Sequence, residues 1–177
     1  FERDQLTSGT TWHAAGLVSQ LGPSATVTKI RKYTLDLYKN LEKEVDHSAG
    51  LRLNGALSIA QTDSRWQELK RQATTAQLYD VKLSILNKDE IKKKYQMMST
   101  EDLKGGVFMP GDGSADPSGV THMLAKGARK GGAKIYEQSP VETILTKNGR
   151  IHGVRVNGQE IECEYAVSYT HLRAHET

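Results

Sequence analysis

The sequence predicts a mixed α/β fold in which short strands alternate with amphipathic helices. Apolar residues recur at helical spacing through 28–45, where Ile30, Leu37 and Val45 share one face and lysines lie largely on the other. Alternation with period two follows in 51–59, and the later chain contains two Asn-Gly pairs of the kind that close β-hairpins. We therefore expect a sheet-containing fold in which the 28–45 helix covers a sheet.

The densest set of polar groups near the start lies between Ser8 and Thr11. Gly9 allows backbone angles that other residues avoid, while Ser8, Thr10 and Thr11 offer hydroxyls and backbone N–H groups where a helix is expected to begin. Such a helix N-terminus suits a phosphate. The alternative is an ordinary helix-entry turn, which often has the same composition.

His13 follows directly, between Trp12 and the small pair Ala14-Ala15. The three residue types provide a bulky wall, a nucleophilic imidazole and a floor that a flat ring can approach closely. A histidine beside a tryptophan is more often a packed or surface residue, so the spacing leaves both interpretations open.

The run Leu6-Thr7-Ser8-Gly9-Thr10-Thr11-Trp12-His13-Ala14-Ala15-Gly16-Leu17 resembles the flavin-attachment segment of the sarcosine dehydrogenase and dimethylglycine dehydrogenase family. These are FAD-dependent proteins with a D-amino-acid-oxidase-like fold. The resemblance implies that His13 is bonded covalently to FAD. Attack by an imidazole nitrogen on the flavin 8-methyl carbon needs a nucleophile that is uncharged near neutral pH, and histidine meets both conditions. The cofactor-binding residues that we expect are Glu2, Arg3, Ser8, Gly9, Thr10, Thr11, Trp12, His13, Ala14, Ala15, Gly16, Leu17 and Val141.

Glu2 stands at the end of what reads as a buried strand. In a Rossmann-type fold, a Gly-rich fingerprint precedes by about 20 residues an acidic residue that binds the ribose hydroxyls of the dinucleotide. Glu2 is placed to be that acid, so we expect the fingerprint upstream of residue 1. The chain has 177 residues and begins without Met, and we expect it to be an internal fragment of a longer protein.

Composition argues against several classes of protein. The net charge of +3 is spread along the chain, and Lys92-Lys93-Lys94 lacks interleaved aromatic residues, so we expect no nucleic-acid partner. Cys163 is the single cysteine, which excludes an intrachain disulfide. No apolar run is long enough for a membrane span.

A second family signature lies at Gly111-Asp112-Gly113-Ser114-Ala115-Asp116-Pro117. It reads as a tight turn followed by a helix with Asp116 as its N-cap and Pro117 at its first position. A metal site made of Asp112 and Asp116 is the alternative, although capping already explains the spacing. Two further helices are expected after Thr62-Asp63 and after Asn87, each of which can cap a helix.

The last part of the chain reads as a strand at 133–136 followed by an antiparallel unit of strands at 141–146, 151–156 and 160–163. In proteins that this chain resembles, the valine of a Pro-Val-Glu-Thr-Ile-like strand lies against the adenine. Here that residue is Val141, for which an ordinary core position is the alternative.

The resemblance implies a division of the chain into four parts. We expect residues 1–47 to belong to a partial Rossmann-type FAD-binding domain, 48–112 to an antiparallel-sheet substrate domain, and 113–166 to the return to the FAD-binding domain. The run 167–177 resembles a translated sequencing adapter, so we expect a non-native tail there. Its alternative is a genuine polar tail in which His171 and His175 share a metal.

The function implied by the resemblance is oxidative demethylation of a small N-methyl amine, sarcosine or dimethylglycine. The electron acceptor would be an electron-transfer flavoprotein or oxygen, and the released carbon would become formaldehyde or pass to tetrahydrofolate in a C-terminal domain. We expect a mitochondrial matrix location in a eukaryote and a cytoplasmic one in a bacterium. The same family includes a regulatory subunit of pyruvate dehydrogenase phosphatase, so a non-catalytic scaffold is the alternative, and an isolated fragment with open strand edges would aggregate.

Overall fold

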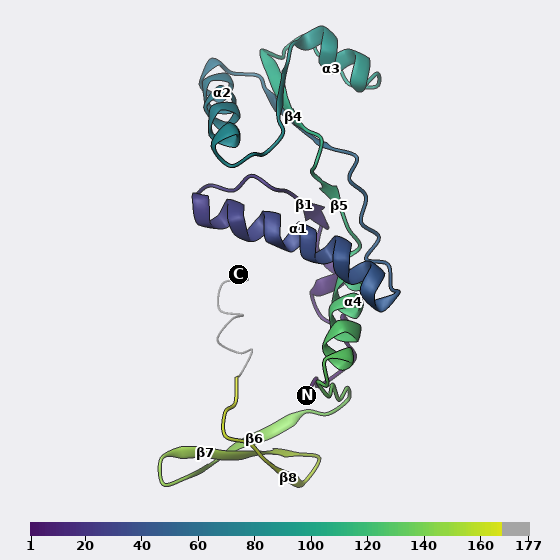
Figure 1. Cartoon of the computed structure of the whole chain (residues 1–177), viewed down its shortest axis with the longest axis vertical. Helices are drawn as coiled ribbons and strands as arrows, with labels where there is room; N and C mark the ends of the chain where they lie inside the picture. Colours follow the sequence, from purple (N-terminus) through teal and green to yellow (C-terminus); the bar gives the residue numbers. More distant parts are fainter. Residues whose placement is uncertain (168–177) are drawn as a thin grey trace.

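The computed structural model describes residues 1–167. The molecule is elongated, with three structural regions stacked along its long axis (Figure 1). At one end lie a three-stranded sheet and two helices, in the middle two further helices and a two-stranded sheet, and at the other end a second three-stranded sheet. Residues 168–177, which include most of the predicted non-native tail, lie outside the described residues.

The first end of the molecule is built on the sheet β2-β4-β3, whose strands are all antiparallel neighbours. The strands are β2 (Ala56–Ala60), β3 (Ser84–Leu86) and β4 (Gly105–Met109). Helix α2 (Asp63–Leu78) buries Leu69, Ala73 and Ala76, with Leu69 packed against Val107 of β4. Of the two predicted caps, Thr62 and Asp63, the structure uses Thr62, whose side chain accepts from Arg65 N–H.

A smaller cluster on the same sheet is closed by helix α3 (Lys88–Lys94). Ile91 of this helix packs with Leu86 and Leu103. Asn87 and Glu90 form a reciprocal capping box, in which each side chain accepts a hydrogen bond from the backbone N–H of the other. The predicted Asn87 cap is therefore confirmed.

The middle region pairs helix α1 (Ala25–Val45) with helix α4 (Pro117–Lys130). Val45, Ala49 and Met123 form the buried cluster between them. The prediction for α1 was partly wrong: the helix begins at Ala25, packs against α4 instead of covering a sheet, and leaves Ile30 58% exposed. The predicted Asp116 cap is confirmed, since its carboxylate accepts from the N–H groups of Ser118 and Gly119.

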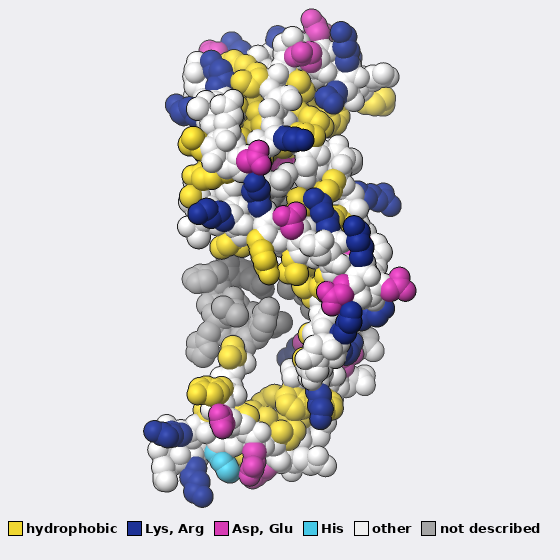
Figure 2. Space-filling view, in the orientation of Figure 1, with side chains coloured by type: hydrophobic (Ala, Val, Ile, Leu, Met, Phe, Trp, Pro, Cys, Tyr) yellow, Lys and Arg dark blue, Asp and Glu magenta, His cyan; other side chains and the backbone are white. Residues whose placement is uncertain are grey.

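The other end of the molecule is the antiparallel sheet β6-β7-β8. Its strands are β6 (Val141–Lys147), β7 (Arg150–Val156) and β8 (Gln159–Glu162). Both Asn-Gly pairs lie in the turns, and Asn148 and Gly149 both have positive φ, as a type I′ hairpin turn requires. Hydrophobic side chains gather on the face of this sheet that Figure 2 shows, whereas Lys and Arg side chains are scattered over the molecule.

Two predicted strands are absent from the described structure, the one at 133–136 and the buried one that was expected to end at Glu2, where residues 1–4 form no strand and Phe1 is 50% exposed. Residues 133–136 form no strand: in this segment Ala133 N–H donates to Ala128 O, and Tyr136 O accepts from Glu2 N–H at the start of the chain. Within residues 1–167, no helix is long and apolar enough to cross a membrane.

Candidate functional site

The segment that carries Trp12 and His13 is an exposed loop with a single helical turn. That turn is the 3-10 helix η1 (Thr11–His13), closed by hydrogen bonds from His13 N–H to Thr10 O and from Ala14 N–H to Thr11 O. The helix that the sequence predicted to begin here is therefore a single turn. Thr10, at the N-cap position, makes no side-chain capping bond.

Trp12 and His13 lie against one another on the surface. Their ring centroids are 3.7 Å apart, with 31° between the ring planes. Trp12 is 59% exposed, and the flanking Ala14 and Ala15 are exposed as well. An exposed imidazole that rests on an indole and is followed by two small side chains can be approached by a flat ring, so these residues fit a flavin.

The end of the same segment is held tightly. Gly16 has φ of +68°, and its carbonyl accepts a hydrogen bond of 2.8 Å from Ala115 N–H, just before α4. A Cβ at Gly16 would lie 2.2 Å from Ala115 O, so no other residue fits without a shift of the backbone. Strand β1 (Leu17–Val18) then pairs antiparallel with β5 (Gly113–Ser114), while the Leu17 side chain stays 82% exposed.

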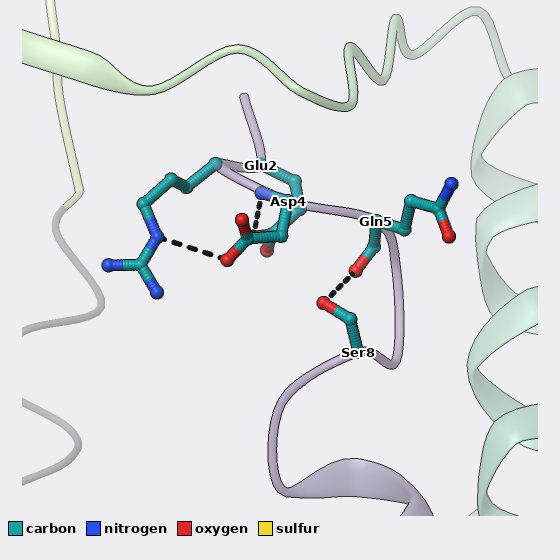
Figure 3. Close-up of polar contacts among 5 residues, drawn as sticks. Glu2, Asp4, Gln5 and Ser8 are labelled. Carbon is teal, nitrogen blue, oxygen red and sulfur yellow. Dashed lines mark hydrogen bonds and ion pairs between the residues drawn. The ribbon is translucent and has the colours of Figure 1, made fainter.

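Near the start of the chain, several polar side chains form hydrogen bonds with residues one to three positions away in the same loop (Figure 3). Glu2 Oε1 accepts from Asp4 N–H at 3.0 Å, and Ser8 Oγ donates to Gln5 O at 2.8 Å. Arg3 Nε donates to Asp4 Oδ2 at 3.0 Å in an exposed pair. The hydroxyl proton of Ser8 is thus already used inside the loop, while Gly9 and Thr10 remain exposed.

The chain start lies beside the segment that leads into β6. Glu2 N–H donates to Tyr136 O and Ser139 N–H donates to Glu2 O, both at 2.8 Å. Val141 begins β6 two residues later and is 44% exposed. The structure therefore brings Glu2 and the start of β6 close together, although the two are far apart in the sequence.

Sequence reasoning missed Glu137, which anchors the loop before the motif. Its Oε1 accepts from Leu6 N–H at 2.7 Å, and its Oε2 lies 3.8 Å from Arg129 Nη2 of α4. No local pattern marks this residue, because its partners are 131 and eight positions away.

The two acids considered for a metal site have different roles. Asp116 is used as the α4 cap, whereas Asp112 is 1% exposed and accepts from Gln20 N–H at 2.9 Å. Burial raises the pKa of Asp112, while the hydrogen bonds from Gln20 and the nearby Arg31 lower it by a smaller amount. Among residues 1–167, no group of three or more His, Cys, Asp or Glu side chains lies close enough to hold a metal ion.

Comparison with known proteins decides the family. The family model described as FAD dependent oxidoreductase matches residues 1–169. The chain belongs to this FAD-dependent oxidoreductase family. The resemblance drawn from residues 6–17 is thereby confirmed, and so is the dependence of the family on FAD.

Curated relatives support the assignment. Human mitochondrial sarcosine dehydrogenase is 37% identical over 162 residues, which cover 91% of this chain and 18% of that protein. Human mitochondrial dimethylglycine dehydrogenase is 32% identical over 147 residues, or 83% of this chain and 17% of that protein. The mitochondrial pyruvate dehydrogenase phosphatase regulatory subunit of Mus musculus is 29% identical over 94% of this chain and 19% of its own length. The chain thus spans about a fifth of the length of these relatives.

A solved structure confirms the fold. L-proline dehydrogenase from P. horikoshii superposes with a TM-score of 0.83 at 24% sequence identity, over 92% of this chain and 43% of that one. The predicted mixed α/β, D-amino-acid-oxidase-like architecture is therefore correct.

Proposed function

We propose that the natural polypeptide containing this chain oxidatively demethylates an N-methylated glycine, sarcosine or dimethylglycine, with FAD held covalently by His13. The observation that carries this proposal is the Thr11-Trp12-His13 turn, which presents an exposed imidazole next to an indole. The relatives at 32–37% identity, a sarcosine dehydrogenase and a dimethylglycine dehydrogenase, support the substrate class. The chain would supply the cofactor side of the reaction.

The roles of the individual residues follow from their positions. The His13 imidazole would act as the nucleophile that bonds to the flavin, and Trp12 would hold its ring plane. Gly16 would fix where the turn stands relative to α4, through its hydrogen bond with Ala115. Glu2 would accept from the ribose hydroxyls, and Val141 would lie against the adenine. The remaining expected cofactor contacts are Arg3, Ser8, Gly9, Thr10, Thr11, Ala14, Ala15 and Leu17.

In this proposal, different residue ranges of the chain belong to the FAD-binding part and to the substrate domain. Residues 1–47 and 113–166 would form the FAD-binding part, and 48–112 would form part of the substrate domain. Bound FAD supplies a two-electron acceptor for a hydride from the N-methyl group. The oxidised amine would then hydrolyse to formaldehyde or pass its carbon to tetrahydrofolate in another domain. The reduced cofactor would be reoxidised by an electron-transfer flavoprotein or oxygen, in the mitochondrial matrix or, in a bacterium, the cytoplasm.

Acid precipitation of the natural polypeptide tests the covalent bond. Yellow flavin should stay with the precipitated protein and be released in a His13→Ala variant. His122→Ala is the matched control, because His122 is an exposed histidine on α4 and should not affect retention. Turnover of sarcosine and dimethylglycine is then measured on the flavin-loaded enzyme. Absence of retained flavin in the wild-type protein would contradict the His13 bond.

A non-catalytic role is the second candidate, favoured by the similarity to the phosphatase regulatory subunit. A scaffold of this kind has no need of a flavin nucleophile, so the intact Thr11-Trp12-His13 sequence favours the enzyme. Colourless protein that binds no FAD when the cofactor is added would move the assignment to the scaffold.

A further inference from the structure

Asp112 is the one buried charged side chain in the described part of the chain. It is 1% exposed and lies between β4 and β5 in the run Gly111-Asp112-Gly113. Burying a carboxyl group is costly unless hydrogen bonds compensate it, so its partners indicate what the position does.

Three chain segments meet at Asp112. Its Oδ1 accepts from the backbone N–H of Gln20 at 2.9 Å, just after β1. Its own carbonyl accepts from Gly55 N–H at 2.9 Å, just before β2. The next residue, Gly113, pairs with Val18 of β1. Asp112 therefore joins the strand that follows the Trp12-His13 turn to the strand that opens the β2-β4-β3 sheet.

The neighbours of Asp112 are packed as closely as the backbone allows. A Cβ at Gly113 would lie 1.9 Å from the carbonyl oxygen of Arg52, a backbone contact that rotation of a side chain cannot relieve. A Cβ at Gly111 would lie 2.1 Å from Gln20 Nε2. The junction thus leaves little freedom to the Asp112 side chain.

The carboxyl group is only partly compensated. Oδ2 is buried without a hydrogen-bond partner, and the charged group that acts on the carboxylate is Arg31 of α1. Arg31 itself donates to Ser19 Oγ at 3.1 Å and to Leu21 O at 2.6 Å, on either side of Gln20. Two charged side chains from different elements therefore hold the same three-residue loop.

We infer that Asp112 is a positioning residue for the cofactor-attachment segment. By holding Gln20 it fixes the end of β1, and β1 in turn fixes where the Trp12-His13 turn lies relative to the β2-β4-β3 sheet. The ties at Gly16, Leu17 and Val18 are backbone bonds, whereas those of the following loop are made by the side chains of Asp112 and Arg31. Of these two, the Asp112 carboxylate accepts from the backbone N–H of Gln20, a tie that a substitution can remove. The inference rests on the proposed attachment at His13.

Peptide-resolved hydrogen exchange of the natural polypeptide tests the tie itself. Asp112→Ala removes the acceptor for Gln20 N–H, so residues 19–22 should exchange about tenfold faster, the factor expected for loss of one buried hydrogen bond. Asp112→Asn keeps an oxygen at the accepting position and should restore the protection. If the alanine variant does not accumulate, Asp112→Leu fills a similar space without an acceptor and should show the same faster exchange.

Measurement of acid-stable flavin distinguishes a positioning role of Asp112 from a general loss of stability. Acid-stable flavin should fall in Asp112→Ala and return in Asp112→Asn. Leu69→Ala is the matched control, because it removes a fully buried side chain of the α2 cluster and should loosen that region while leaving residues 19–22 and flavin attachment unchanged.

Three results would overturn the inference. The first is an unchanged hydrogen-exchange rate at residues 19–22 in Asp112→Ala and Asp112→Leu. The second is an equally large increase in that rate in Leu69→Ala. The third is full flavin attachment in an Asp112 variant whose residues 19–22 exchange faster. A wild-type protein without bonded flavin would instead contradict the proposed function, and the exchange measurement would still decide whether Asp112 holds the loop.

Discussion

Residues 12–15 and residues 16–20, the two halves of the segment that contains His13, differ in how firmly the rest of the protein holds them. Residues 12–15 are exposed, although the Thr11–His13 turn lies beside α4, and the Trp12 ring rests on the His13 ring. Residues 16–20 are tied at almost every position, through Gly16 to Ala115, through β1 to β5 and through Gln20 to Asp112. The difference indicates that a rigid anchor carries a short, accessible turn, which is compatible with the proposed attachment of FAD at His13.

Substitution of Gly16 should break the anchor with the largest effect on stability. In Gly16→Ala the new Cβ meets Ala115 O at 2.2 Å in a backbone with φ of +68°, so we expect a loss of roughly 3 kcal/mol in the free energy of unfolding. Urea denaturation followed by circular dichroism measures it.

Gly149→Ala is the matched control for that experiment. Gly149 also has positive φ, +75°, but a Cβ there would meet nothing within 4 Å. It should therefore cost only about 1 kcal/mol. Equal losses in the two variants would show that the close approach to Ala115 is unimportant.

The cap of α4 should have the next largest effect, because α4 begins beside Ala115. Asp116→Ala leaves the N–H groups of Ser118 and Gly119 without their acceptor and should cost about 1 kcal/mol. Asp116→Asn can still cap and should recover most of the loss. Thermal unfolding of both variants checks this, and a neutral alanine variant would contradict the capping role.

The buried carboxyl group of Asp112 should make the free energy of unfolding depend on pH in the acidic range. Because burial raises its pKa, the folded state binds more protons than the unfolded state, and stability should fall as the pH rises from the ordinary value of 3.8 through the raised pKa. Asp112→Asn, which does not titrate, should flatten this part of the curve. Urea midpoints measured across the acidic range compare the two proteins, and parallel curves would contradict the assignment.

Local features of this fold could be predicted from the sequence, whereas contacts between distant segments could not. The caps at Asn87 and Asp116 and the Asn148-Gly149 turn depend on neighbours within a few residues, and all three were predicted correctly. The burial of Thr28 was missed, because its hydroxyl accepts from Gly22 N–H in a loop that periodicity does not describe.

The candidate site divides in the same way. His13 could be proposed from its sequence context, since the residues around it are contiguous, and its role as the flavin ligand stays a prediction. Asp112 and Glu137 could not be assigned their roles, because their partners Gln20 and Leu6 lie 92 and 131 positions away. A buried Asp between two glycines reads in sequence as a turn, and only packing distinguishes it from an exposed one.

The accessible turn itself should tolerate substitution with the smallest effect on stability. Trp12→Ala removes a side chain that is 59% exposed, so the free energy of unfolding should change by less than about 0.5 kcal/mol. The second tryptophan supplies the contrast. Trp66 packs in the Leu69 cluster and over Gly105, where a Cβ would lie 2.7 Å from its ring, and Trp66→Ala should cost roughly 3 kcal/mol.

The same two variants also test whether flavin attachment depends on Trp12 or on Trp66. Trp12→Ala should lower the fraction of flavin that stays with acid-precipitated protein, because the indole that supports the His13 ring is gone. Trp66→Ala should lower stability while the folded protein keeps its flavin. Because the two substitutions remove the same kind of side chain, Trp66→Ala controls for the loss of an indole. Lower stability with unchanged flavin retention in Trp12→Ala would show that residues 12–15 serve the fold and not the cofactor.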